Sequence, residues 1–328
     1  MEERTSTTYY GYIDKYHAGR RSKILKSHPE VRDFMVRDPS FKYAAGVCSL
    51  TQLLVAYLLR DSSWPFLFFM SCFVGPLFTC AIANAIHETV HELAVDGSVF
   101  ANKLFGNFIN FGLAWPAVAG YYKTHRHHHA YLGTNLDAKY PSMEEAERYD
   151  RTFWSRLRFI FSHPLSFGDR WSLNVPQDEP TDYQRWNMRS VWAVDAILLL
   201  CWGYKSLLYL LVSFWLNDCI YIQGSKNFAD HWVSDDQHTV TSSYYGAINL
   251  INFNIGYHRE HHDFPNVPGR YLRMVYHYAV EHYRDEKFIA KGLFGAVARV
   301  LLAPPGQGIV KHANKLSVGK TASAKLDA

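Results

Sequence analysis

The apolar residues of this chain are gathered in blocks, and polar or charged segments separate the blocks. The first block covers residues 44–59 and ends at a four-residue polar turn, and the second, residues 64–86, has 23 residues without a charged side chain. At about 1.5 Å of rise per residue, a helix over the second block spans the roughly 30 Å hydrocarbon core of a bilayer. The two blocks therefore predict two membrane-spanning helices joined by a short loop.

Two later apolar blocks depart from this simple pattern. Residues 104–122 carry no charge but are interrupted by glycine, asparagine and proline, so we expect a re-entrant or interfacial segment there. A single helix over residues 191–224 would be about 50 Å long, too long for one crossing, so a hairpin that turns near residues 203–206 is expected. Its first arm is short for a span. Asp195 and Asp218 fall within the arms, where a buried carboxylate is a candidate functional residue. Both also lie near the expected cytosolic ends of the arms, where a carboxylate is more easily hydrated.

This pattern predicts an all-α integral membrane protein made of transmembrane helical hairpins with a cytosolic helical cap and an even number of crossings. We divide it into a cytosolic N-terminal segment (1–43), a membrane domain (44–290) and a cytosolic C-terminal tail (291–328), which we expect to be disordered after Lys311. Residues 1–43 carry nine Lys and Arg and no apolar core of a signal peptide, so we expect them in the cytosol. The polar residues 123–190 are expected there as well.

Composition and charge change this picture little. The mean hydropathy of -0.18 is that of a soluble protein, but it averages over apolar blocks and polar segments. A net charge of +4 is too small to indicate nucleic-acid binding. The five cysteines all lie in apolar blocks without a CxxC pair, so neither a disulfide framework nor a cysteine zinc site is expected.

Eight of the seventeen histidines fall in three short groups that follow or separate the apolar blocks. Each group contains residues three or four positions apart, whose imidazoles share one face of a helix. A further pair with one-turn spacing, Asn227 and His231, lies at the end of the last apolar block. The three groups are His87 and His91; His125, His128 and His129; and His258, His261 and His262.

Eight or nine imidazoles exceed what one four-coordinate zinc ion can use, but they suit two metal ions with positions open for oxygen or substrate. Imidazole binds iron, copper, nickel and zinc alike, so number and grouping, not residue type, favour a dinuclear iron site. Because each hairpin returns the chain to the side it left, all three groups fall on the cytosolic face and can share one chamber. Five acidic neighbours could accept the second ring N–H of the ligands or lie exposed at the surface: Glu88, Asp137, Asp230, Glu260 and Asp263.

Two other interpretations of the histidines are open at this point. Residues 87–91 match HExxH, the zinc metalloprotease signature in which Glu88 would be the general base. A zinc protease needs only one further ligand, which leaves the other two groups without a role. Metal storage or transport would explain the histidines but not their membrane frame, and it predicts exchangeable metal without oxygen chemistry.

At these residues the chain resembles the membrane fatty acid desaturase and hydroxylase superfamily, and within it the sphingolipid delta-4 desaturases, also called dihydroceramide desaturases. The resemblance covers about residues 12–283 and includes the stretch from His17 to Val31 and the continuation of the second histidine group as Tyr-Leu-Gly. The most specific match is the run from Asn252 to Pro265, NFNIGYHREHHDFP, preceded by SYYG.

The resemblance implies a di-iron enzyme of the endoplasmic reticulum membrane that uses O2 and electrons from cytochrome b5 and its NAD(P)H-dependent reductase. Its substrate would be dihydroceramide, desaturated at C4–C5 of the sphingoid base to ceramide, and C4-hydroxylation shares the first hydrogen abstraction. Carried over by position, the eight grouped histidines and His231 become iron ligands, and Asn227 would hold a water on the metal.

Some residues depart from the pattern or stand outside it. His127 occupies a position where relatives commonly carry an acidic residue, and Arg259 one where asparagine is common. On a helix His127 points about 160° away from His129, so it is not expected to be a further ligand. Neither His-Pro sequence, at 28–29 and 163–164, has the glycines of a haem-binding motif, so the electron donor is expected in trans. Basic residues could steer an acidic donor or form a positive cytosolic flank: Arg20, Arg21, Lys23 and Lys26.

Overall fold

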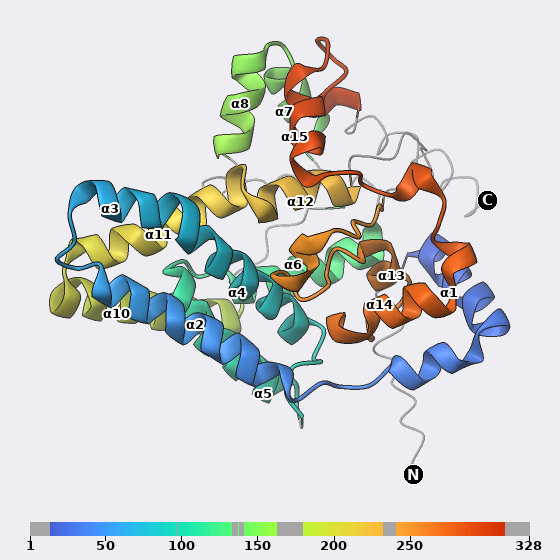
Figure 1. Ribbon diagram of the computed structural model, residues 1–328, viewed down its shortest axis with the longest axis horizontal. Coiled ribbons are helices and arrows are strands. Elements are labelled where there is room, and N and C mark those ends of the chain that lie inside the picture. The colour runs from blue at the N-terminus through green and yellow to red at the C-terminus, as the bar shows by residue number, and fades with distance from the viewer. Residues whose placement is uncertain are drawn as a thin grey trace.

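The computed structural model describes residues 14–96, 98–132, 137, 141–162, 180–231 and 241–311, and in these residues the chain is helical. The β structure in this part of the chain is one isolated bridge between Ser243 and Ile289. The polar tail after Lys311 lies outside the described residues. Figure 1 shows two regions: a bundle of long helices at one end and a set of shorter helices at the other.

Long apolar helices form the bundle. They are α2 (Phe41–Leu58), α3 (Trp64–Phe69) continued through a π-helical turn (Met70–Val74) into α4 (Gly75–Val90), α10 (Asp182–Trp202) and α11 (Tyr204–Cys219) followed by α12 (Ile222–His231). Three stretches are long and apolar enough to cross a membrane: Phe41–Leu58, Trp64–Val90 and Tyr204–His231. The first two predicted spans are thereby confirmed as helices of membrane-spanning length and composition.

The predicted hairpin over residues 191–224 has its break at Gly203, whose φ of 85° lies in the left-handed region that favours glycine. Its first arm is longer than expected, because α10 begins at Asp182 and has 21 residues, about 31 Å of helix. α10 is not among the three apolar stretches of the described chain, and Arg185, Arg189 and Asp195 interrupt its apolar sequence. The number of crossings therefore stays a prediction.

The segment expected to be re-entrant or interfacial is two helices with a break between them. α5 (Val99–Asn110) ends in a 3₁₀ turn (Phe111–Leu113), and α6 (Val118–Tyr131) begins after Ala114, which has a φ of 51°. The fully buried Asn110 satisfies the broken backbone, since its side chain donates to the Trp115 carbonyl at 2.6 Å and accepts from the amides of Ala117 and Val118 at 3.0 Å. Without water, an irregular backbone in such surroundings needs partners of this kind.

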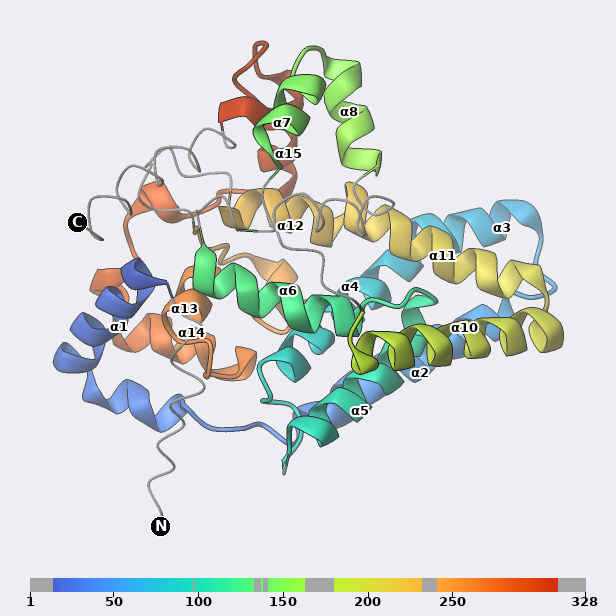
Figure 2. The same ribbon diagram turned by 180° about the vertical axis from the view of Figure 1, so that it is seen from behind.

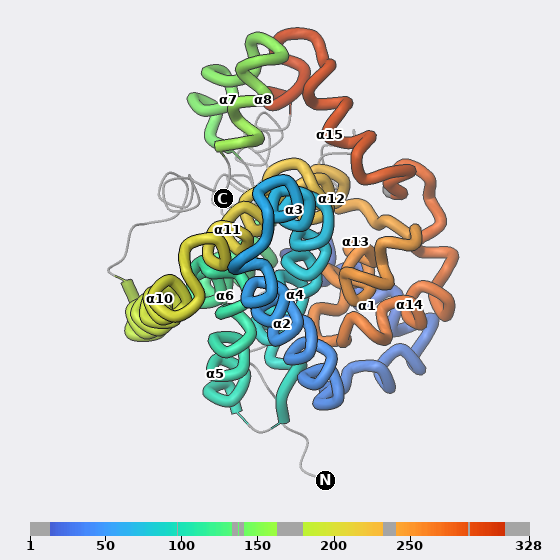
Figure 3. The backbone as a smooth tube through the Cα atoms, turned by 60° about the vertical axis from the view of Figure 1, so that its left-hand side comes forward, coloured from blue at the N-terminus to red at the C-terminus, as the bar shows by residue number. Residues whose placement is uncertain are grey.

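Shorter helices cover the end of the bundle that carries the histidines. α1 (Lys15–Ser27), the 3₁₀ helix Pro29–Phe34, α13 (His258–Asp263) and α14 (Gly269–Tyr278) pack together, far from the α3 end of the bundle (Figures 1 and 2). α7 (Met143–Tyr149), α8 (Phe153–Ser162) and α15 (Leu293–Leu302) form a separate layer that contacts α12 through α15 (Figure 3). Short 3₁₀ turns complete the described fold at Ala247–Leu250, Val280–His282 and Glu286–Phe288.

Candidate metal centre

Four helices bring the grouped histidines into one buried volume. α4 carries the first group at its C-terminal end, α6 the second, and the short α13 the third, while His231 is the last residue of α12. None of these nine side chains is more than 5% exposed. Helical spacing within each segment and the convergence of the segments therefore place nine imidazoles together.

The imidazoles separate into two groups, of which the first has five members. His261 Nε2 lies 3.0 Å from both His87 Nε2 and His129 Nε2. His125 Nε2 lies 3.0 Å from His91 Nε2 and 3.1 Å from His129 Nε2. We call this set the five-histidine group; it draws on α4, α6 and α13.

The second set, the four-histidine group, consists of His128, His231, His258 and His262. His258 Nε2 lies 2.9 Å from His231 Nε2 and 3.0 Å from His262 Nε2. His128 turns its Nδ1 to Asp137 Oδ1 at 2.7 Å. The two groups are adjacent, since the rings of His129 and His262 stack with centroids 4.2 Å apart.

The spacing of the ring nitrogens fits metal ions. A neutral imidazole has one N–H, so five converging Nε2 atoms cannot all be hydrogen-bonded to one another, whereas a cation at their centre satisfies all of them. With metal–nitrogen bonds of about 2.1 Å, ligands at right angles lie about 3.0 Å apart and tetrahedral ligands about 3.4 Å apart. The observed 3.0 Å fits the right-angled arrangement of a six-coordinate ion such as iron better than tetrahedral zinc.

The protonation state also suits metal binding. Burial lowers the pKa of five of these rings well below the ordinary histidine value, and the neighbouring imidazoles lower it further. They are therefore neutral at neutral pH, the form in which imidazole ligates a metal. The rings outside the candidate spans for which this holds are His91, His125, His258, His261 and His262.

Of the five acidic neighbours, Asp137 accepts a hydrogen bond from a grouped histidine, and two others lie close. Asp230 Oδ2 is 3.6 Å from His258 Nδ1 and pairs with Lys226, and Glu88 Oε1 is 3.7 Å from His87 Nδ1. For Glu260 the expectation is wrong, because its carboxylate accepts from Ser243 and Tyr245 at 2.6 and 2.7 Å. Burial raises the pKa of Glu260 to about 7 against these two hydrogen bonds.

Asp263 likewise faces away from the ligands and joins the N-terminal helix to the third histidine group. It accepts from His17 Nδ1 at 2.6 Å, from the Arg20 guanidinium at 3.1 Å and from the Tyr283 hydroxyl at 2.9 Å. Although burial alone raises the pKa of Asp263, Arg20 and His17 together hold it below its usual value. Arg21 also turns inward, to Asn266 Oδ1 at 3.1 Å. These two arginines therefore anchor α1 on α13 and on the segment that follows it, and do not form an exposed basic flank.

The stretch from His17 to Val31 stands out in the sequence because it resembles the sphingolipid desaturases. The sequence alone did not predict that it contacts the third histidine group. His17 is fully buried, and its Nε2 lies 3.0 Å from Thr241 Oγ1. The two departures from the family pattern lie outside both histidine groups. The ring of His127 packs on Tyr131 with centroids 4.4 Å apart, and Arg259 donates to the Tyr16 hydroxyl at 2.9 Å.

The zinc-protease interpretation fits this geometry poorly. The five-histidine group places three further imidazoles beside His87 and His91, while a catalytic zinc uses three protein ligands and one open position. Glu88, the required base, is 2% exposed, and both its oxygens lie 3.3 Å from the Gly269 amide, which donates to them. Its carboxylate is thus directed at a backbone amide of α14.

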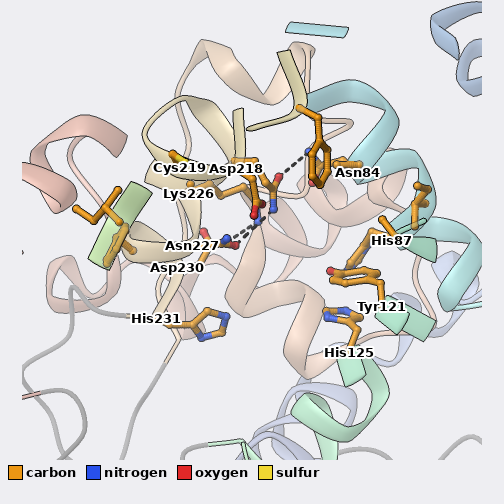
Figure 4. Close-up of a pocket in the computed structure, with 18 of the residues that line it drawn as sticks. Asn84, His87, Tyr121, His125, Asp218, Cys219, Lys226, Asn227, Asp230 and His231 are labelled. Carbon is orange, nitrogen blue, oxygen red and sulfur yellow. Dashed lines mark hydrogen bonds and ion pairs between the residues drawn. The ribbon is translucent and has the colours of Figure 1, made fainter. Parts of the chain in front are cut away.

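A cavity of about 110 Å³ opens beside both groups between α4, α6, α11 and α12. Its lining includes grouped histidines, among them His87 and His231, and apolar side chains such as Leu113 and Phe214. Figure 4 shows grouped histidines at one end of the cavity and polar residues of α4 and α12 along its wall. A cavity of roughly 150 Å³ takes up benzene, so this one has room for a short piece of a lipid-like molecule next to the histidine groups.

Comparison with known proteins agrees with this site. Residues 62–289 match the model of the fatty acid desaturase family, and the chain belongs to this family of membrane oxidoreductases. Residues 9–40, which contain α1 and its anchor, match the separate model of the sphingolipid delta-4 desaturase family.

The similar proteins are sphingolipid desaturases. The sphingolipid delta(4)-desaturases of Drosophila melanogaster and Mus musculus are each 33% identical, over 83% and 84% of this chain and 84% of their own lengths. A Caenorhabditis elegans protein named for both delta(4)-desaturase and C4-monooxygenase activity is 34% identical over 82% of this chain and 74% of its own. No solved structure matches this chain.

Proposed function

We propose that this protein is a sphingolipid delta-4 desaturase that converts N-acyl sphinganine (dihydroceramide) to ceramide. The observation that carries the chemistry is the pair of histidine groups with nitrogens about 3.0 Å apart. The match of residues 9–40 and the names of the relatives support the substrate class.

The nine grouped histidines would hold two non-haem iron ions, one in each group. With O2 and electrons from cytochrome b5 and its reductase, bound iron supplies the oxidising chemistry that removes hydrogen from an unactivated methylene. Five and four imidazoles would leave room at each ion for a water, oxygen or substrate. Asn227, one turn before His231, remains the candidate to hold a water in such a position.

The remaining residues of the chain orient ligands and exclude water. Asp137 fixes the ring of His128, and the anchor of His17 and Arg20 on Asp263 holds α13 in place next to His262. The apolar lining of the cavity keeps the reacting methylenes dry and in one register, which is necessary because neighbouring methylenes are chemically alike.

The substrate is tested by expressing the protein in a host without delta-4 sphingolipid desaturation and analysing the long-chain bases by mass spectrometry. Sphing-4-enine should appear only with O2 and a functional cytochrome b5 system. New double bonds in glycerolipid acyl chains, with saturated sphingolipids, would refute the substrate. Phytosphingosine as the single new base would assign a C4-hydroxylase, the second activity in the name of the nematode relative.

Metal analysis tests the centre. Purified active protein should contain two iron atoms per chain, and one reproducible zinc without iron would contradict the proposal. His128→Ala and His262→Ala should abolish turnover and leave membrane insertion intact, because insertion depends on the apolar helices. Equal loss of inserted protein would mean that these residues serve folding instead.

The proposed location is the endoplasmic reticulum membrane with both termini and all histidines on the cytosolic side, where cytochrome b5 can reach them. Glycosylation acceptors engineered into residues 135–185 should stay unmodified, while an acceptor in the short loop between α2 and α3 should be on the lumenal side. Efficient modification within 135–185 would exclude a common cytosolic chamber.

A further inference from the structure

Three amide side chains form a row along one wall of the cavity beside the metal centre. Asn84 of α4 donates from Nδ2 to Gln223 Oε1 of α12 at 3.2 Å, and Gln223 Nε2 donates to Asn227 Oδ1 at 3.4 Å. All three line the cavity, and Figure 4 labels the two outer members, Asn84 and Asn227. We call Asn84, Gln223 and Asn227 the amide row.

The amide row lies within one or two helical turns of metal-binding histidines. Asn84 precedes His87 by three residues on α4, and Asn227 precedes His231 by four residues on α12. These offsets place both amides on the same helix faces as the histidines, with a rise of about 4.5 to 6 Å. A polar group held by the row therefore lies beside the reacting centre.

The hydrogen bonds within the row do not use all its polar atoms. Asn84 is 3% exposed, and its Nδ2 also donates to the Cys80 carbonyl at 2.8 Å, yet no described residue donates to its Oδ1. Gln223 Nε2 uses one of its two N–H groups on Asn227, and no described residue accepts from the other. Because Asn84 lines the cavity, its free amide oxygen can accept a hydrogen bond from a ligand there. The row thus offers both an acceptor and a donor to a ligand.

We propose that the amide row binds the hydroxyl next to the reacting carbons of the substrate and so selects C4–C5 for reaction. This inference rests on the proposed function. A hydroxyl both donates and accepts, which matches the row. In the sphingoid base the 3-hydroxyl oxygen is about 2.4 Å from C4, two covalent bonds away, and a hydrogen bond adds about 2.9 Å. Their sum of about 5.3 Å limits how far C4 can lie from the amide that holds the hydroxyl, so C4 stays in the part of the cavity that His87 and His231 also line.

The cavity also suits a substrate with polar groups near its reacting carbons. A volume of about 110 Å³ holds only a short piece of the lipid, and that piece faces the row. A mid-chain pair of methylenes with apolar neighbours on both sides would bury these amides without partners. Asn84 and Gln223 therefore act as positioning residues that favour a hydroxylated substrate over a plain acyl chain.

The test compares two substrates, N-acyl sphinganine and its analogue without the 3-hydroxyl, in the wild type and in Asn84→Leu. Wild-type enzyme should prefer the hydroxylated substrate in kcat/KM at least about tenfold, since a site that binds a hydroxyl discriminates against its absence. Asn84→Leu should lose at least about tenfold on the hydroxylated substrate and little on the analogue. The preference should therefore collapse, and the double bond should appear at more than one position.

Asn107→Leu is the matched control. Asn107 is a buried amide that joins α5 to α10 through Asn187 and Ser190, at 2.8 and 3.0 Å, and does not line the cavity. Its replacement should lower thermal stability and leave the substrate preference unchanged. If Asn84→Leu does not fold, the half-buried Gln223→Leu replaces it in the same comparison.

The outcomes separate this inference from the proposed function. Equal losses on both substrates in the row variants would make the row a structural link between helices and overturn the inference, while ceramide formation by the wild type would still support the function. Absence of wild-type turnover on both substrates would refute the proposed function and with it the inference.

Discussion

Replacement of Arg20 by methionine tests whether the N-terminal helix is anchored by one buried ion pair. Arg20 donates to both oxygens of Asp263, at 3.1 and 3.2 Å from Nε and 3.1 Å from Nη2. The Asp263 side chain is fully buried and that of Arg20 is 16% exposed. Methionine keeps the apolar stem of the side chain and removes the charge.

Loss of one partner leaves the Asp263 carboxylate buried with only His17 and Tyr283 as donors. Breaking a buried pair in this way costs about 3 to 5 kcal/mol, and the partial exposure of Arg20 favours the lower end. An unfolding entropy of about 2.1 cal/mol/K per residue converts about 3 kcal/mol into a fall of roughly 4 °C in Tm for a chain of this length. Tryptophan fluorescence during thermal unfolding in detergent measures it.

Lys23→Met is the matched control, because Lys23 is exposed on the same helix and carries the same charge. Its Tm should stay within about 1 °C of the wild type, as surface substitutions change stability little. Equal falls in Tm for both variants would refute the reasoning, since the total positive charge of α1 would then matter and not the contact with Asp263.

Three further predictions concern helix packing, the break before α6 and pH. Gly75→Ala should destabilise the bundle by about 1 to 3 kcal/mol, because a Cβ there would lie 1.9 Å from an oxygen of α11. Gly46→Ala, with open space around it, should not destabilise the protein. Equal Tm values for the two variants would contradict the close packing at Gly75. Asn110→Leu should cost about 2 to 4 kcal/mol, because three hydrogen bonds to the broken backbone are lost, and a wild-type Tm would show that other groups satisfy it. The hydrogen bond with Glu281 raises the pKa of His28, and His28 in turn lowers the pKa of Glu281. The pair therefore stabilises the fold between these two pKa values, and its contribution is lost as pH rises through that of His28. In Glu281→Gln the fall in Tm between about pH 6 and about pH 8 should be smaller than in the wild type. The same dependence of Tm on pH in both proteins would contradict this prediction.

Local sequence determined the helices and the face on which each histidine lies. Uncharged apolar runs of sufficient length can hardly form anything but spanning helices in a bilayer, so residues 44–59 and 64–86 were predictable to within a few residues. Spacings of three and four residues put the imidazoles of each segment on one face. The helix α15 was not predicted, since ten residues of apolar sequence near a polar tail do not reveal the contact with α12 that stabilises it.

Only the tertiary structure decided how the histidines divide between two groups. His128 and His129 are neighbours in sequence, yet about 100° of helical rotation sends them to different groups, one beside His231 and the other beside His261. Each group combines three segments of the chain, and no local pattern encodes which segments meet. The contact between His17 and Asp263 spans 246 residues for the same reason. Such contacts arise because each helix must bury its own apolar or polar face, and the faces that fit are known only once all helices are packed.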